Sequence, residues 1–161
     1  MFTVAGIRKL HSWTHASLTV VLDHLSVIPQ SDYVKELPGF GFPTLRAQMM
    51  HIFNCELFWI HTLQGVRFVD EDPADWPEVS DARALQGKVG ANTLAYLSAL
   101  TDEQLNAKSE VRFPDGDTAI RTPALLLHHI FTHAFHHKGQ IVTMCRALGC
   151  PLPGTDLNQF E

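Results

Sequence analysis

The sequence predicts an all-α protein with the architecture of a four-helix bundle. Four segments of about 20 or more residues carry apolar residues at helical spacing. The stretches between them are rich in proline, glycine and acidic residues and show little sign of strands. Because helices with one apolar face bury that face against one another, four of them are expected to form a bundle. A chain of 161 residues can build one substantial core, so we expect residues 1–161 to form a single domain.

The first two helices are expected over residues 5–27 and 44–63. Pro29 ends the first helix, and the proline- and glycine-rich residues 29–43 are expected to form a loop. Gly65 is expected to end the second helix. Apolar residues at helical spacing define the buried faces of both segments. They are Ile7, Leu10, Leu18, Val21, Leu22 and Leu25 in the first, and Leu45, Met49, Ile52, Phe53, Leu57 and Ile60 in the second.

The third helix is expected over residues 81–100, with Ser80 as its cap. The acidic, proline-bearing residues 66–80 before it predict a long crossover or surface loop. Residues 101–121 contain Pro-Asp-Gly-Asp at 114–117, which is typical of a turn. A short β-hairpin is therefore possible before the last helix, with an irregular loop as the alternative.

The fourth helix is expected from Pro123 to about Leu148. Thr122 and Pro123 suit an N-cap and a first helical position, and Gly149 suits the stop. This segment is rich in histidine, because residues 125–141 hold five of the ten histidines of the chain. They are His128, His129, His133, His136 and His137.

Composition excludes several classes of function. The formal net charge is −5 and there is no run of lysine or arginine, which argues against a nucleic-acid partner. No stretch approaches about 20 uninterrupted apolar residues, so no membrane span is expected. The N-terminus does not resemble a signal peptide. The three cysteines, Cys55, Cys145 and Cys150, show no paired pattern, and we expect a reduced, cytoplasmic protein.

Within the histidine-rich segment, His133 and His137 are four residues apart and therefore lie on one face of the helix. Neutral imidazole is the commonest protein ligand for transition metals, so the pair offers two ligands. His51, in the middle of the second helix among core-type residues, is the leading candidate for a third. Three imidazoles and a water around a metal ion form a known open catalytic pattern. The sequence therefore predicts a metal site at His51, His133 and His137.

Ordinary roles compete with this interpretation. A lone core histidine such as His51 is more often hydrogen-bonded than metal-bound, and histidines fall four apart by chance. His11 and His15 show the same spacing without a wider cluster, and we expect them to be surface or interface residues. Glu56 is five residues from His51, so it should point away from the metal and form a structural salt bridge.

Five further residues lie near the predicted ligands by helical geometry. They could orient the ligands or hold a substrate, or they could be ordinary polar contacts of a bundle. A fourth ligand from Cys55 would close the site and make it structural, which we do not expect. No separate catalytic residue is assigned. The five residues are His129, Gln48, Asn54, Cys55 and Gln140.

The chain resembles the DinB-like metalloprotein superfamily. The resemblance rests on His51 in HIFNCELFW, on His133 and His137 in HAFHHKGQI, and on the lead-in DGDTAIRTPALLLHHIFTH. It implies an up-down-down-up four-helix bundle with a long connection between the second and third helices. It also implies a zinc or nickel ion held by the three histidines, and a homodimer. Lys138 stands where the family usually has arginine, which departs from the pattern.

Relatives with this triad include transferases for bacillithiol and mycothiol and a thiol-dependent isomerase. The resemblance therefore implies a metal-dependent enzyme that activates a low-molecular-weight thiol for transfer to a small-molecule substrate. A hydrolase that uses metal-bound water is an alternative, but the sequence shows no clear general base for it. A non-enzymatic metal-binding bundle of the stress response is a second alternative. An interaction module that uses Phe2, Trp13 or Trp76 is a third.

Overall fold

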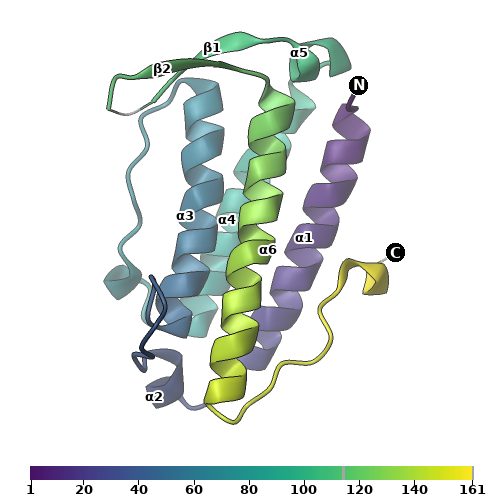
Figure 1. The fold of residues 1–161 in the computed structure, drawn as a ribbon. Coiled ribbons are helices and arrows are strands. Elements are labelled where there is room, and N and C mark those ends of the chain that lie inside the picture. Colours follow the sequence, from purple (N-terminus) through teal and green to yellow (C-terminus); the bar gives the residue numbers. More distant parts are fainter. Residues whose placement is uncertain (114, 161) are drawn as a thin grey trace.

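The computed structural model describes residues 1–113 and 115–160. Within these residues, four long helices pack side by side (Figure 1). Helix α3 packs against α4 and α6, and α1 packs against the same two helices. The prediction of a helical protein is therefore confirmed. The long helices are α1 (Val4–Leu25), α3 (Leu45–Gln64), α4 (Val79–Ser98) and α6 (Pro123–Ala147).

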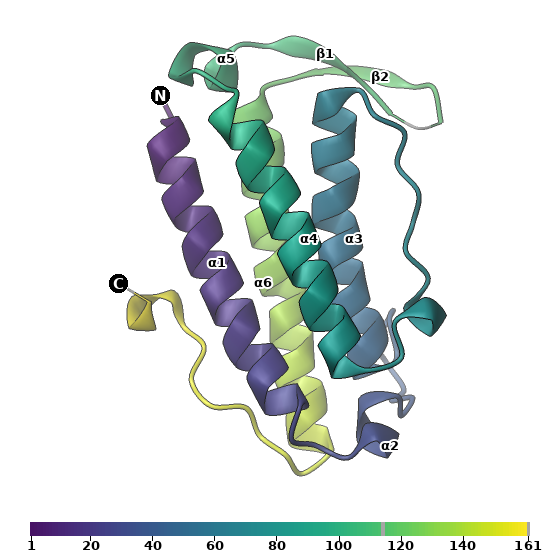
Figure 2. The same cartoon turned by 180° about the vertical axis from the view of Figure 1, so that it is seen from behind.

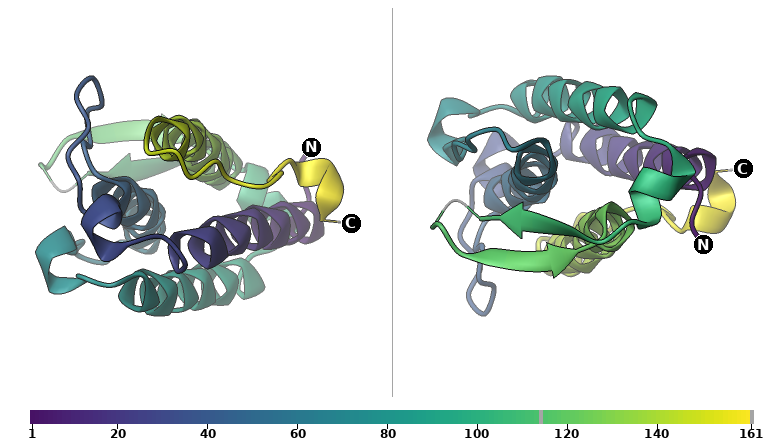
Figure 3. Two further views of the ribbon diagram at one scale, coloured as in Figure 1. Left: turned by 90° about the horizontal axis from the view of Figure 1, so that it is seen from below. Right: turned by 90° about the horizontal axis from the view of Figure 1, so that it is seen from above.

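The direction of each helix can be followed in Figures 1 and 2. Helices α1 and α6 run down the page, whereas α3 and α4 run up it. Between α3 and α4, residues 65–78 return along the outside of the bundle from its top to its bottom (Figure 2). The views along the bundle in Figure 3 show the four helices around one centre. This arrangement places α3 and α6, the two helices that carry the predicted metal ligands, against each other.

Helix ends follow the local chemistry expected of them. The side chain of Thr44 accepts a hydrogen bond from the backbone of Ala47, and the side chain of Thr122 accepts one from Leu125. Gly149 follows α6 with φ of 77°, a conformation that glycine adopts without strain.

The start of α4 differs from the prediction. The helix begins at Val79, and its N-cap is Glu78 instead of Ser80. The carboxylate of Asp81 accepts a hydrogen bond of 2.9 Å from the Glu78 backbone N–H. This reciprocal cap uses a carboxylate at the third helical position and leaves Ser80 inside the first turn.

The β-hairpin that was predicted as one of two alternatives is present. Strand β1 (Ser109–Arg112) pairs antiparallel with β2 (Thr118–Arg121). Figures 1 and 3 show the hairpin across the end of the bundle where α3 ends and α6 begins. Pro114 of the predicted turn lies outside the described residues.

Several short elements lie outside the four helices predicted from the sequence. They are too short to produce a periodic pattern in the sequence. The longest, α5, is held by the Thr101 side chain, which accepts from the Gln104 backbone at 3.2 Å. The short elements are α2 (Gln30–Tyr33), η1 (Pro73–Asp75), α5 (Asp102–Asn106) and η2 (Leu157–Gln159).

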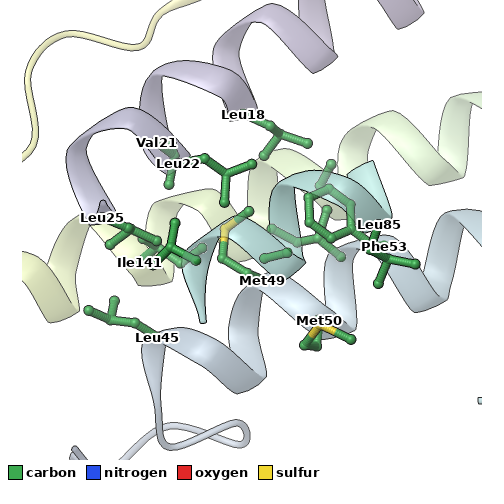
Figure 4. Packing of buried hydrophobic residues seen from close by; sticks show 14 of the residues in the cluster. Leu18, Val21, Leu22, Leu25, Leu45, Met49, Met50, Phe53, Leu85 and Ile141 are labelled. Carbon is green, nitrogen blue, oxygen red and sulfur yellow. The ribbon is translucent and has the colours of Figure 1, made fainter. Parts of the chain in front are cut away.

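The buried apolar residues of the described chain form two clusters along the bundle. Figure 4 shows the larger one, in which Leu22, Met49 and Ile141 meet from three helices. The smaller one includes Ile7 and Leu127 and lies toward the hairpin. Their burial supplies most of the driving force for helix packing. None of the helices in the described residues is long and apolar enough to cross a membrane.

Candidate metal centre

The three histidines predicted to hold a metal ion lie together between α3 and α6. His133 and His137 are one turn apart on α6, and His51 faces them from α3. The Nε2 atoms of His51 and His133 are 3.0 Å apart, and one potential ligand atom from each of the three rings lies within 4.8 Å of the others. The ring centroid of His137 is 4.5 Å from that of His51 and 4.4 Å from that of His133. The arrangement can therefore surround one ion with three imidazoles.

Gln48 determines which nitrogen of His137 carries a hydrogen. The Gln48 amide nitrogen donates to the Phe42 carbonyl at 2.8 Å and to Gln140 Oε1 at 2.8 Å. Its amide oxygen therefore faces His137, and His137 Nδ1 donates to it at 2.8 Å. Because Nδ1 carries the hydrogen, the Nε2 lone pair of His137 is free to bind a metal.

His51 and His133 face each other through their Nε2 atoms. Two neutral imidazoles can form a hydrogen bond through their Nε2 atoms only if one of these atoms carries the hydrogen. A cation between the rings would instead use both Nε2 lone pairs. The buried Nδ1 of His133 has no hydrogen-bond partner among the described residues, so nothing there holds the hydrogen at one nitrogen. The donor set as a whole fits a divalent ion.

The electrostatics of the cluster keep the imidazoles neutral. Burial, together with the neighbouring His137 and His51, lowers the pKa of His133 to about 3. Burial and the nearby His51 lower the pKa of His137 to about 4. The pKa of His51 is also lowered, again by burial, although Asp70 opposes the shift. At neutral pH the three rings are uncharged, and an uncharged ring is the form that binds metal.

A pocket opens beside His51. Its volume is about 430 Å³, and the Phe42 ring stacks on His51 at a centroid distance of 3.8 Å. A smaller pocket of about 220 Å³ shares His51, Asn54 and Asp70 with the first. His51 thus connects the histidine cluster to space that a small molecule can enter. The larger pocket is lined by Phe42, Ala47, Met50, His51, Asn54, Asp70, Glu71, Asp72 and Pro73.

The other predicted residues differ in what they contact. Gln48 and Gln140 form the hydrogen-bonded chain beside His137, and Gln140 continues to His136 at 2.8 Å. The Asn54 side chain instead donates to the Glu71 carbonyl at 2.8 Å and accepts from the Glu71 backbone N–H at 3.1 Å. Asn54 therefore holds the connection between α3 and α4 against the bundle and so shapes the pocket.

Cys55 and His129 lie outside the group of three histidines. Burial raises the pKa of the Cys55 thiol to about 12, so it stays protonated and is a poor ligand. The His129 ring packs edge-on against Trp59 at 5.3 Å and lies 5.7 Å from the His133 ring.

Phe42 and Asp70 also lie beside the cluster, although no pattern in the sequence pointed to them. Both lie in connections without helical periodicity, so spacing could not relate them to His51. The acidic run around Asp70 was visible in the sequence, but its position against α3 depends on the path of the connection.

The prediction for His11 is wrong. His11 is only 3% exposed, and its Nε2 lies 3.0 Å from the Glu56 carboxylate on α3. His15 contacts the other oxygen of the same carboxylate, also at 3.0 Å. The structural salt-bridge role predicted for Glu56 is confirmed by these contacts.

Lys138 stands at the position where the family that the sequence resembles usually has arginine. It is buried and holds the C-terminal tail against α1. Its ammonium group donates to Ser17 Oγ at 3.0 Å and to the Thr155 carbonyl at 2.6 Å. Figure 1 shows the tail returning beside α1. Lys138 faces α1 and the tail, away from the three histidines.

The fold and the group of three histidines describe a DinB-like helical protein. The chain matches the model of the DinB family over residues 1–161, and it belongs to this family. It is similar to the protein DinB of Bacillus subtilis (strain 168), with 22% identity over 160 residues that cover 94% of this chain and 91% of the relative. It is also similar to the uncharacterized protein YizA of the same organism, with 25% identity over 108 residues and 67% of each chain covered.

Solved structures agree on the fold. A DinB-like protein from Bacillus cereus ATCC 10987 superposes with a TM-score of 0.69 and 24% identity, covering 96% of this chain and 99% of that one. The DinB-like protein YjoA from Bacillus subtilis superposes with a TM-score of 0.62 and 22% identity, covering 92% and 98%. At these identities the likeness establishes a shared fold and nothing about the reaction.

Proposed function

We propose that this DinB-family protein binds one divalent metal ion, zinc or nickel, at His51, His133 and His137. We propose further that it is a metal-dependent enzyme of the S-transferase type, which activates a low-molecular-weight thiol. One observation carries the proposal: three neutral imidazoles from two facing helices converge beside a pocket. Three protein ligands leave a coordination position for a thiol or a water.

The ion would supply the acidity that this chemistry requires, because it lowers the pKa of a thiol or a water bound to it. The protein supplies position and shielding. Phe42 covers one face of His51, and Met50 adds apolar surface to the pocket. Gln48 holds the ring of His137 in place through Nδ1. These contacts fix the ligand geometry before a substrate arrives.

A hydrolase is the alternative, and the structure offers a reason to keep it. Asp70 lines both pockets together with His51. A carboxylate in this position can accept a proton from a nucleophilic water, which is the general-base role that the sequence did not reveal. The remaining alternative is a non-enzymatic metal-binding bundle of the stress response, in which the ion has a structural role.

The wider setting of the protein is part of the same proposal. We propose a single domain with up-down-down-up helix order, which the helix directions in Figures 1 and 2 support. We also propose a homodimer that acts on a small-molecule substrate in the cytoplasm, without a nucleic-acid or membrane partner. The net charge of −5 supports the last point, because a nucleic-acid partner requires basic surface.

The metal site is tested with tag-free protein whose metal content is measured by inductively coupled plasma mass spectrometry. Wild-type protein is expected to retain a zinc or nickel ion that is lost from His137→Ala, with affinity lowered by more than about 100-fold. His128→Ala is the matched control on the same helix, and it should retain the ion. Equal metal content in the wild type and His137→Ala would contradict the site.

The reaction is tested with the metal-loaded protein. Thiol consumption is followed with a panel of small thiols and monochlorobimane as the electrophile. Turnover that is lost in His137→Ala and kept in Asp70→Asn supports the S-transferase. Ester or amide hydrolysis that is lost in both variants supports the hydrolase, and no turnover by the metal-loaded protein in either assay supports the non-enzymatic role.

A further inference from the structure

A second cluster of potential metal ligands lies in the interior of the bundle, away from the three histidines. It consists of His11 and His15, one turn apart on α1, and Glu56 on α3. One potential ligand atom from each of the three lies within 4.8 Å of the others. His11 and Glu56 are only 3% exposed, whereas the His15 side chain is 16% exposed. It lies at a level of α1 between Ile7 of the smaller apolar cluster and Leu18 of the larger one.

The distances suit a common ion. The Nε2 atoms of His11 and His15 each lie 3.0 Å from one oxygen of the Glu56 carboxylate. Ligands about 2.0–2.1 Å from one ion are separated by roughly 2.9 Å at right angles and roughly 3.4 Å at the tetrahedral angle. The two nitrogen–oxygen separations fall in this range, so small movements of the side chains would admit an ion.

A partner behind the carboxylate fixes its orientation. The hydroxyl of Thr93 on α4 donates to Glu56 Oε1 at 2.6 Å. Metal-binding carboxylates are commonly held by such outer hydrogen bonds. Thr93 is fully buried, so this contact is not shared with bulk water.

Gly90 makes room for the second histidine. A Cβ atom at Gly90 would lie 3.0 Å from Cε1 and 3.2 Å from Nδ1 of His15, so the His15 ring would have to shift by a few tenths of an ångström to admit it. Glycine inside a helix is less favourable than alanine. Because this buried helical position has no side chain, it leaves space for the His15 ring.

A route to the cluster also exists. His11 and His15 line a cleft of about 600 Å³ between α1 and α4, and Glu56 lies behind the two rings. Arg83, Gln86 and Leu94 are among the other lining residues. A hydrated ion can reach the two imidazoles through this cleft, which an entirely enclosed polar cluster would not allow.

We propose that His11, His15 and Glu56 form a second binding site for a divalent transition-metal ion. Two imidazoles and one carboxylate suit Fe²⁺, Mn²⁺, Co²⁺ and Zn²⁺. In the metal-free protein the imidazole N–H groups occupy the carboxylate oxygens. When the ion binds, the hydrogen of each ring is held at Nδ1 and the Nε2 lone pairs turn to the metal. The site is independent of the three-histidine centre.

The experiment counts Co²⁺ ions bound by chelator-treated protein, from visible absorption and equilibrium dialysis. Wild-type protein is expected to bind two equivalents, and the double variant His133→Ala/His137→Ala one. Adding Glu56→Gln to that variant should lower the affinity for the remaining ion by at least about 100-fold. Far-UV circular dichroism checks that each variant retains its helices. No Co²⁺ bound by the folded double variant would overturn the proposal while leaving the three-histidine centre intact.

Two glycines on α4 give a second, milder test in the same double-variant background. Gly90→Ala is expected to weaken Co²⁺ binding about tenfold, because the new methyl group displaces His15. Gly87→Ala is the matched control, because nothing lies within 4 Å of a Cβ added there, and it should change the affinity less than about twofold. An affinity that is unchanged by both Gly90→Ala and Glu56→Gln would show that the remaining ion binds elsewhere, and it would overturn the proposal.

Discussion

Two histidine pairs with the same four-residue spacing lie in very different surroundings in this protein. His133 and His137 on α6 meet a third imidazole, His51, so their cluster has no fixed charge when the rings are neutral. His11 and His15 on α1 meet a carboxylate, Glu56. Spacing on one helix thus creates a pair of ligands, and the residue on the facing helix decides its chemistry.

The charge of the third residue decides how each cluster is stabilised. Removing a carboxylate from water is costly unless hydrogen bonds and counter-charges offset the loss. Burial alone would raise the pKa of Glu56, but the adjacent His15 and His11 hold it well below its usual range. Glu56 therefore remains ionised in the interior, with Thr93 as a third donor. The three-histidine cluster carries no charge when its rings are neutral and needs no such compensation.

The largest expected effect comes from removing Glu56. Glu56→Leu leaves His11, His15 and Thr93 without their shared acceptor, and it should lower the free energy of unfolding of the metal-free protein by about 3–5 kcal/mol. Urea denaturation followed by circular dichroism measures the change. Asp23→Ala is the control: its ion pair with Arg83 is solvent-exposed on both sides and is worth less than about 1 kcal/mol. Equal losses in the two variants would contradict the structural role of Glu56.

An intermediate effect on Co²⁺ affinity is expected from two variants, each of which removes a hydrogen-bond partner from only one of the two clusters. Gln48→Leu removes the acceptor of His137 Nδ1 and is expected to weaken Co²⁺ binding at the three-histidine centre about tenfold. Thr93→Val removes the donor to Glu56 and should weaken binding at the second site by a similar factor. Each variant is measured where only one site is intact: Glu56→Gln for the first, His133→Ala/His137→Ala for the second. If each variant weakened both sites equally, the clusters would not be independent.

The smallest expected effect is that of mild acid on metal-free protein. The lowered pKa values of His133 and His137 mean that the unfolded chain binds protons before these folded rings do. Their stabilisation is complete above about pH 6.5 and is lost as the pH falls toward about 4 for His137 and about 3 for His133. The lowered pKa of Glu56 acts in a lower window, because its stabilisation is present above about pH 4.5 and is lost in stronger acid.

Urea midpoints at pH 7.0, 5.5 and 4.5 measure this difference. The midpoint of the wild type should fall at each step, and His137→Asn should reduce this fall without abolishing it, because His133 still contributes. Glu56→Gln should leave the dependence in that range unchanged. If Glu56→Gln reduced the pH dependence in this range and His137→Asn did not, the result would contradict the higher titration window assigned to the three-histidine cluster.

Much of the fold was accessible from the sequence because the signals are local. Helical periodicity identified the four long helices, and Thr44, Thr122 and Gly149 marked ends that the structure confirms. The short helix α5 carries no period, and the cap at Glu78 depends on the reciprocal contact with Asp81. The structure also brought together the three histidines chosen from spacing and position.

The sequence by itself determined which segments are helical and which residues share a helix face, because both depend on intervals of three and four residues. It therefore specified His133 with His137, and equally His11 with His15. Only the tertiary structure decided that the second pair meets Glu56, that Asp70 and Phe42 border His51, and that Gln48 sets the hydrogen of His137. These contacts depend on how each helix is rotated and shifted against its neighbours. That relation is set by the packing of the whole core, which no local pattern contains.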